Sequence, residues 1–201
     1  MLATAIDRSE VVSFFDSQAP TWDFGRKPCP KKLESILSFA DIQAGDRILD
    51  VACGTGVLFP CYLSRKVTGI VGVDISSNMI ARAREKYKES CIELYNLDIE
   101  QARFDQLFDK VMLFNALPHF PSPGRLVEML ATFTKVGGRL TIAHDMGRVH
   151  LNSVHCHKAR GVSLELIGET ELASLLSSFF TVDIVRSDKD MYVVSGIRNR
   201  L

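Results

Sequence analysis

Short apolar runs recur along the chain and alternate with amphipathic segments. Five of these runs are rich in Val, Ile and Leu and nearly continuous in apolar character: 47–52, 68–74, 91–98, 110–115 and 138–144. A strand that is covered on both faces has this pattern. The segments between them space apolar residues three and four positions apart, as at Met79, Ile80 and Ala83, which predicts helices. The alternation predicts an α/β fold, a doubly wound and mostly parallel sheet with right-handed crossovers.

Both ends of the chain depart from this rhythm. The sequence predicts a helix from Thr170 and then two strands, 180–187 and 191–198, joined by only three residues. A link of that length cannot form a parallel crossover, so the two strands form an antiparallel hairpin. Helical patterns also precede the first strand, at 9–19 and 30–40, and a further helix is predicted to end at Gly137.

Length, charge and cysteine content narrow the class of protein. The chain has 201 residues, enough for one domain with a sizeable core. Lys and Arg number 24, as do Asp and Glu, so no net charge attracts nucleic acid or an anionic membrane. No apolar run approaches the roughly 18 residues of a membrane span, and the first residues do not resemble a signal peptide. The five cysteines are scattered and odd in number, which favours a cytoplasmic protein.

The stretch "LDVACGTG" (49–56) contains the first candidate site. Asp50 ends a strand, and Gly54 and Gly56 would let a ligand approach the backbone. Asp74 ends the next strand, 20 positions after Gly54, which is the spacing of a carboxylate that binds ribose hydroxyls. Phe59 stands where a dinucleotide fold has its third glycine. A ribose-containing ligand with an ammonium or sulfonium group therefore fits better than a pyrophosphate.

Five motifs in order, "LDVACGTG", "VGVDISSNMI", "LDIE", "FNALPHF" and "VGGRLTIAH", resemble the class I S-adenosylmethionine-dependent methyltransferases. Within that family the sequence is most similar to the small-molecule branch that includes ubiquinone and menaquinone biosynthesis enzymes. The resemblance implies a Rossmann-like seven-stranded sheet with an antiparallel C-terminal strand. It implies one domain over 1–201: N-terminal helices and a lid (1–45), a cofactor-binding core (46–144), and an acceptor-side helix with the C-terminal hairpin (145–201). The implied reaction is in-line methyl transfer to a small-molecule acceptor, with S-adenosylhomocysteine as the second product.

The resemblance also assigns roles to single residues. The first motif would hold the methionine part of the cofactor through Asp50, Ala52, Gly54 and Gly56. The ribose and adenine would meet Asp74, Ile75, Asp98 and Ile99. Asn115 would face the methyl group and the acceptor, and the lid would include Phe15, Trp22 and Asp23.

Polar residues near the ends of the fourth and fifth strands indicate an acceptor pocket. We expect Asn115, His119 and His144 to lie near the transferred methyl group as catalytic residues. A helix that follows the fifth strand would carry Arg148, Asn152 and His155 on one face, as substrate contacts.

Two other interpretations of these histidines stay open. A divalent metal could be held by His144 and His155 with Asp145, although "HxxxxHCH" has no standard ligand spacing. The same residues could also form a solvated helix face and satisfied strand ends, with no chemistry.

Two other functions compete with methyl transfer. One is a non-catalytic S-adenosylmethionine-binding sensor, and the other is a nicotinamide-dependent oxidoreductase, which Asp50 and Phe59 disfavour. The expected partner is a small-molecule acceptor, with no nucleic acid and no membrane span, and a homodimer stays open.

Overall fold

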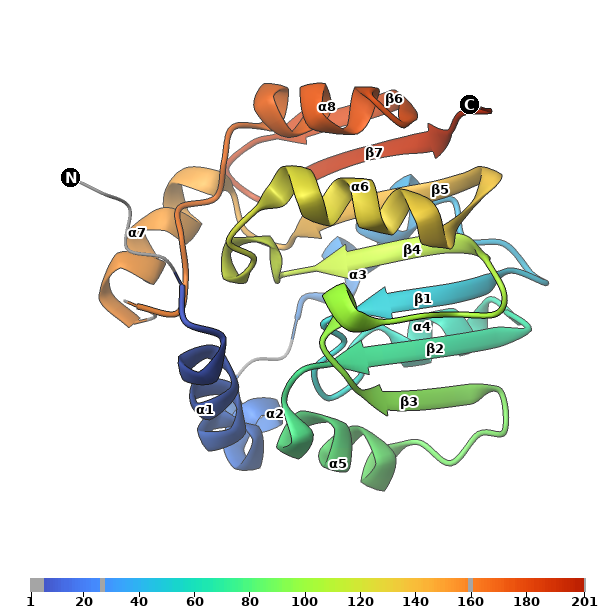
Figure 1. The fold of residues 1–201 in the computed structure, drawn as a ribbon. Helices are drawn as coiled ribbons and strands as arrows, with labels where there is room; N and C mark the ends of the chain where they lie inside the picture. Colours follow the sequence, from blue (N-terminus) through green and yellow to red (C-terminus); the bar gives the residue numbers. More distant parts are fainter. Residues whose placement is uncertain (1–5, 26–27, 159–160, 201) are drawn as a thin grey trace.

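The computed structural model describes residues 6–25, 28–158 and 161–200, with backbone only at 25 and 155–158. Its centre is a seven-stranded sheet in the order β3-β2-β1-β4-β5-β7-β6 (Figure 1). The strands are β1 (Arg47–Val51), β2 (Gly69–Asp74), β3 (Ile92–Asn96), β4 (Phe108–Phe114), β5 (Thr134–His144), β6 (Phe180–Ser187) and β7 (Tyr192–Arg198). Neighbouring strands from β3 to β5 are parallel, and β7 runs antiparallel to both β5 and β6. The predicted fold class, with its one reversed strand, is therefore confirmed.

Helices cover both faces of this sheet and its carboxyl edge. They are α1 (Arg8–Gln18), η1 (Ala19–Thr21), α2 (Trp22–Gly25), α3 (Pro30–Phe39), α4 (Phe59–Ser64), α5 (Ser77–Lys86), η2 (Ile99–Gln101), η3 (Leu117–His119), α6 (Pro123–Phe133), α7 (Arg148–Lys158) and α8 (Glu169–Ser177). The apolar sides of α6 and α8 share one core with the sheet, and those of α3 and α4 share the other. The short α1 and α2 lie beyond the arrowheads of β1 and β2 (Figure 1).

The strand order places a crevice between β1 and β4. The chain leaves β1 toward β2 on one side, and β4 then returns to the other side of β1. At such a point the connections diverge to opposite faces, which leaves room for a ligand at the carboxyl ends of the strands. Every residue of β2 is buried, as are Ile48 to Val51 of β1, so the strand ends are held rigidly.

Two predicted helix boundaries are wrong. The helix α6 ends at Phe133 and not at Gly137, because β5 already begins at Thr134. The Thr134 hydroxyl donates to the carbonyl of Leu130 at 2.7 Å, and Thr134 pairs with Phe108 of β4. In addition, α8 begins at Glu169 and not at Thr170. No helix among the described residues is long and apolar enough to cross a membrane.

Candidate functional site

A cavity of about 880 Å³ opens at the carboxyl ends of the parallel strands. Each of the first five strands contributes residues that follow it. They are Ala52, Cys53 and Gly54 after β1, Asp74 and Ile75 at the end of β2, Asp98 and Ile99 after β3, Asn115 after β4 and Asp145 after β5. Pockets for small ligands and cofactors have volumes of about 300–1,000 Å³, so this one has room for a large ligand.

The loop after β1 owes its shape to residues in the left-handed region. Ala52, Gly54 and Gly56 have φ values of 54°, 55° and 82°. A Cβ at Gly54 would meet only Nε1 of Trp22, at 3.9 Å, so the backbone there borders the cavity. A Cβ at Gly56 would lie 2.6 Å from the ring of Phe59. Gly56 therefore makes room for core packing and does not line the cavity, contrary to the expectation that it lets a ligand approach the backbone.

Asp74 is fixed at the cavity wall by two backbone amides. Its Oδ2 accepts a hydrogen bond from the N–H of Gly54 and its Oδ1 from the N–H of Ser76, both at 2.8 Å. Burial raises the pKa of Asp74 to about 6, and the two N–H donors oppose that rise. Each carboxylate oxygen can accept more than one hydrogen bond, so Asp74 can also accept from two neighbouring hydroxyl groups.

Asp50 lies behind the loop and does not line the cavity. Its carboxyl group is buried, with 2% of the residue exposed. Burial raises its pKa to about 7, the neighbouring Tyr62 hydroxyl lowers it, and the charge of Asp74 raises it further. Its predicted contact with the methionine part of the cofactor stays a prediction.

The cavity is also lined by Ile75, Asp98 and Ile99, as expected from the sequence. Asp98 has two structural partners. Its Oδ1 caps η2 by accepting from the N–H of Glu100 at 3.0 Å, and its Oδ2 lies 2.7 Å from the guanidinium of Arg8. Arg8 also contacts the Glu100 carboxylate.

Residues 8–25, here called the N-terminal cover, lie over the cavity and are joined to three strand-end loops. Arg8 binds the segment after β3, as described above. Asp16 accepts hydrogen bonds from the Ser76 hydroxyl at 2.5 Å and from the N–H of Asn78 at 3.0 Å, after β2. Asp23 accepts from the Thr55 hydroxyl at 2.7 Å, after β1. One residue of the cover thus contacts each of the segments that follow β1, β2 and β3. These contacts support the predicted lid.

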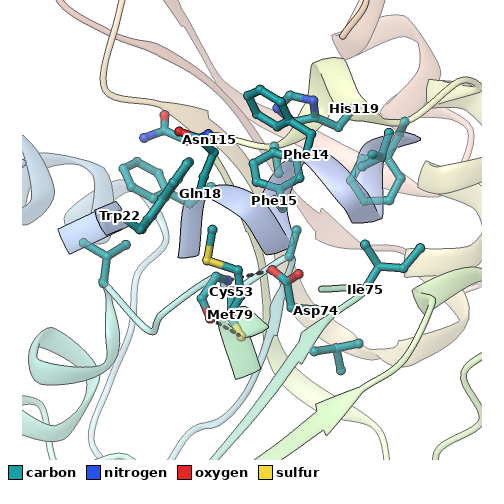
Figure 2. Close-up of a pocket in the computed structure, with 18 of the residues that line it drawn as sticks. Phe14, Phe15, Gln18, Trp22, Cys53, Asp74, Ile75, Met79, Asn115 and His119 are labelled. Carbon is teal, nitrogen blue, oxygen red and sulfur yellow. Dashed lines mark hydrogen bonds between the residues drawn. The ribbon is translucent and has the colours of Figure 1, made fainter. Parts of the chain in front are cut away.

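Aromatic rings of the cover form one wall of the cavity. Figure 2 shows Phe14, Phe15 and Trp22 above Asp74, with His119 beside the two phenylalanines. The Phe15 ring meets the rings of Phe14, Trp22 and His119 edge to face, with centroid distances of 5.2, 5.7 and 4.9 Å. This wall is apolar, which suits an aromatic or aliphatic group of a ligand.

His119 lies at the end of η3 and lines the cavity. Its Nδ1 donates a hydrogen bond to the carbonyl of Val162 at 2.7 Å, because a carbonyl oxygen can only accept. In the neutral imidazole this bond places the proton on Nδ1 and the lone pair on Nε2. The geometry therefore suits a proton acceptor at Nε2.

Asn115 and Asp145 form a reciprocal pair at the ends of β4 and β5. The Asn115 side-chain amide donates to Asp145 Oδ1 at 2.9 Å and accepts from the Asp145 N–H at 3.1 Å. Asn115 itself has a φ of 55°, a conformation that asparagine tolerates better than most residues. The pair holds one carboxylate at the cavity wall.

Other predicted site residues lie elsewhere. The His144 ring is fully buried, meets the Tyr192 ring edge to face at 6.0 Å, and does not line the cavity. His144 is the last residue of β5 and pairs with Tyr192 of β7. Its side chain therefore points to one face of the sheet and not toward the cavity at the strand ends.

The polar stripe of α7 has partners outside the cavity. Arg148 Nε lies 3.9 Å from the Glu169 carboxylate of α8. The Asn152 amide oxygen accepts from the N–H of Leu166 at 2.8 Å. The side chain of His155 lies outside the described residues. Helical spacing placed Arg148 and Asn152 on one face correctly, but that face meets the segment around α8.

No group of three or more His, Cys, Asp or Glu side chains is arranged to hold a metal ion in the part of the chain that the structure describes. Sequence reasoning did not identify Arg8 and Lys32, which line the cavity, or Asp16, which joins the N-terminal cover to the segment after β2. Lys32 Nζ donates to the carbonyls of Asp145 at 3.2 Å and Asp190 at 3.0 Å. All three act on residues more than 50 positions away, so no local pattern marks them.

Fold and cavity together define an α/β protein with a ligand-sized cavity at the switch point of its sheet. Comparison with known proteins narrows this class. Residues 48–138 match a family model described as a methyltransferase domain. A malonyl-[acyl-carrier protein] O-methyltransferase of Acetivibrio thermocellus is 31% identical over 75% of this chain and 54% of its own length. A ubiquinone biosynthesis O-methyltransferase of Coxiella burnetii is 30% identical over 67% of this chain and 61% of its own.

A solved methyltransferase structure has a similar fold. The N-methyltransferase NodS of Bradyrhizobium japonicum, in complex with S-adenosylhomocysteine, superposes with a TM-score of 0.76 at 14% identity, over 94% of this chain and 99% of that one. The chain therefore contains a methyltransferase domain over residues 48–138, and its sheet has the class I fold that the sequence resembles, which agrees with S-adenosylmethionine as the cofactor of that family. It spans only about half the length of the first curated relative.

Proposed function

We propose that the protein binds S-adenosylmethionine and transfers its methyl group to a small-molecule acceptor in the cytoplasm. One observation carries the proposal. The Asp74 carboxylate is held by two backbone amides at the wall of a cavity that also contains the exposed backbone of Gly54. A carboxylate in this position accepts both hydroxyls of a ribose, and a missing Cβ lets the rest of the nucleoside approach.

The bound cofactor supplies a methyl group on a positively charged sulfur. The residues of this chain bind the cofactor, orient the acceptor and exclude water from the cavity. Asp74 holds the ribose, and Ile75 and Ile99 pack on the adenine. The N-terminal cover closes the cavity through its three polar links, which removes water from around the reacting atoms.

His119 is the proposed proton acceptor. The bond from its Nδ1 to the Val162 carbonyl leaves Nε2 as the basic atom of the neutral ring. A proton leaving the acceptor would pass to Nε2 when the acceptor is not already nucleophilic at neutral pH. Asn115 and Asp145 are proposed to position the acceptor, whereas His144 is assigned a packing role against Tyr192.

Neither alternative function gains support from the geometry. A pure sensor would need only the cofactor end of the cavity, yet aromatic rings and His119 line the rest of it. A dinucleotide would need a glycine where Phe59 stands, and Phe59 is fully buried beneath the loop. The cytoplasmic location is supported by the free thiols of Cys29, Cys53, Cys61 and Cys91.

The cofactor part of the proposal is tested by calorimetric titration with S-adenosylhomocysteine. We expect the unaltered protein to bind and Asp74→Ala to lose at least about tenfold in affinity, as is typical for hydrogen bonds to a charged group. Asp105→Ala removes an exposed carboxylate outside the cavity and is the matched control. Equal affinity of both variants would contradict the assigned role of Asp74, and no binding by the unaltered protein would contradict the proposed function.

The catalytic part is tested with His119→Asn. The asparagine amide can keep the donation to the Val162 carbonyl, but it lacks a basic nitrogen. With an acceptor that must lose a proton, we expect S-adenosylhomocysteine release to slow by about 10²-fold or more while cofactor affinity is unchanged. An unchanged rate across the pH range would contradict this role.

A further inference from the structure

The cavity wall is acidic among the described residues. Carboxyl groups outnumber cationic side chains there: Asp23, Asp74, Asp98, Glu100 and Asp145 against Arg8 and Lys32. S-adenosylmethionine carries an ammonium, a sulfonium and a carboxylate, so one net positive charge offsets only part of this excess. Arg8 pairs with Asp98 and Glu100, and Lys86 pairs with Asp23, so the excess of negative charge at the wall comes from Asp74 and Asp145. This excess disfavours an anionic acceptor.

Both cations already have partners in the protein. Arg8 contacts the carboxylates of Asp98 and Glu100, and Lys32 Nζ donates to two backbone carbonyls and lies 3.7 Å from the Asp190 carboxylate. An acceptor with a carboxylate or phosphate would have to displace one of these contacts. Arg148, the cation expected to hold such a group, is directed to Glu169.

The acceptor end offers two kinds of contact that suit a cation. Asp145 presents a carboxylate at the wall, positioned by Asn115. Opposite the strand ends, the rings of Phe14, Phe15 and Trp22 line the same cavity (Figure 2). Aromatic faces attract ammonium groups, and the attraction increases where water is excluded.

We propose that the acceptor is an amine with an apolar or aromatic body and no anionic group. This inference rests on the proposed function and names the acceptor class of the same site. The ammonium form is held between Asp145 and the aromatic wall, and its proton passes to His119 Nε2 or to water. The amine nitrogen then forms a bond to the methyl carbon as the carbon–sulfur bond breaks, and sulfur keeps the electron pair.

The experiment compares three ligands of nearly equal shape in the presence of saturating S-adenosylhomocysteine. They are 2-phenylethylamine, 2-phenylethanol and 3-phenylpropanoate, which carry a positive, no and a negative charge. Titration calorimetry measures each affinity. We expect the amine to bind at least about tenfold more tightly than the carboxylate, with the alcohol between them.

Variants assign the preference to named groups. Asp145→Asn should lower amine affinity by about tenfold and leave alcohol affinity unchanged. Trp22→Leu, which leaves the Asn115 and Asp145 side chains in place, should weaken the amine more than the alcohol. Glu85→Gln removes an exposed carboxylate of α5 that pairs only with Arg82 among the interactions described, and it should change neither affinity.

The outcomes separate the two proposals. If S-adenosylhomocysteine binds but the amine binds no better than the carboxylate, the acceptor class is wrong and the proposed function stands. Tighter binding of the carboxylate than of the amine would assign the site to an anionic acceptor, and it would overturn the proposal. If S-adenosylhomocysteine does not bind, both proposals fall.

Discussion

Asp50 gives a prediction about stability whose sign and size follow from its burial. In the unfolded chain its carboxyl group ionises near 3.8, and in the folded protein burial raises the pKa to about 7. Between these values the folded state holds a proton that the unfolded state has lost. The free energy of unfolding must therefore fall as the pH rises through this window.

The magnitude follows from the two pKa values. A difference of one between folded and unfolded pKa values corresponds to about 1.36 kcal/mol, so a difference of about three gives about 4 kcal/mol well above pH 7. Asn has nearly the same shape as Asp and does not titrate. Asp50→Asn should therefore be more stable than the unaltered protein by up to about 4 kcal/mol at about pH 8, by less than about 2 kcal/mol at about pH 5, and by almost nothing below about pH 4.

Urea unfolding of the cofactor-free protein at these pH values provides the measurement, followed by circular dichroism and by fluorescence of Trp22. Asp109→Asn is the control with the opposite sign. Burial alone would raise the pKa of Asp109. Hydrogen bonds from Lys135 and from the Arg47 N–H lower it by more, so the net pKa is below its usual value. The Asp109 variant should lose stability at neutral pH. A stability difference for Asp50→Asn that is constant with pH, or a less stable variant at about pH 8, would refute the reasoning.

Three further results are expected. Asp23→Ala removes the link of the cover to Thr55, so S-adenosylhomocysteine should dissociate faster in stopped-flow measurements while the melting temperature changes little; an unchanged rate would count against a closing role. Gly147→Ala should destabilise the protein by about 1–3 kcal/mol in urea unfolding, because the new Cβ would lie 2.1 Å from the Asp188 carbonyl oxygen; wild-type stability would show that the loop can move. Affinity for S-adenosylhomocysteine should weaken as the pH falls through about 6, where the Asp74 carboxylate takes up a proton; calorimetry that shows no such fall would contradict its role in ribose binding.

Much of the sheet could be predicted because its central strands are covered on both faces, whereas the edge strand β3 has no buried residue. Continuous apolar runs marked β1, β2 and β4. The short link between the last two predicted strands required a hairpin, and in the structure the four residues 188–191 join β6 to β7. The boundary between α6 and β5 could not be predicted in the same way. The helical spacing of Leu126, Leu130 and Phe133 runs directly into the strand without a turn residue, so Gly137 was the nearest visible stop signal.

The cofactor end of the site was predictable because its residues are close in sequence and fixed by backbone geometry. Gly54 and Asp74 follow adjacent strands at a set spacing, and they are hydrogen bonded to each other. The acceptor end depends on which face of α7 meets the cavity. Periodicity identifies residues that share a face, but Glu169 and Leu166, which bind Arg148 and Asn152, follow after the helix and give no sign of this contact in sequence.

The links of the N-terminal cover have a consequence for the order in which the chain is built. Arg8 lies 92 residues before its partner Glu100, and Asp16 lies 60 residues before Ser76. At roughly 5–20 residues per second, a ribosome needs about 5–20 s to make the stretch between Arg8 and Glu100. During that time Phe14 and Phe15 have left the ribosome before the surface that will bury them exists. The cover is therefore translated before the loops that hold it, and it can close over the cavity only after those loops have formed.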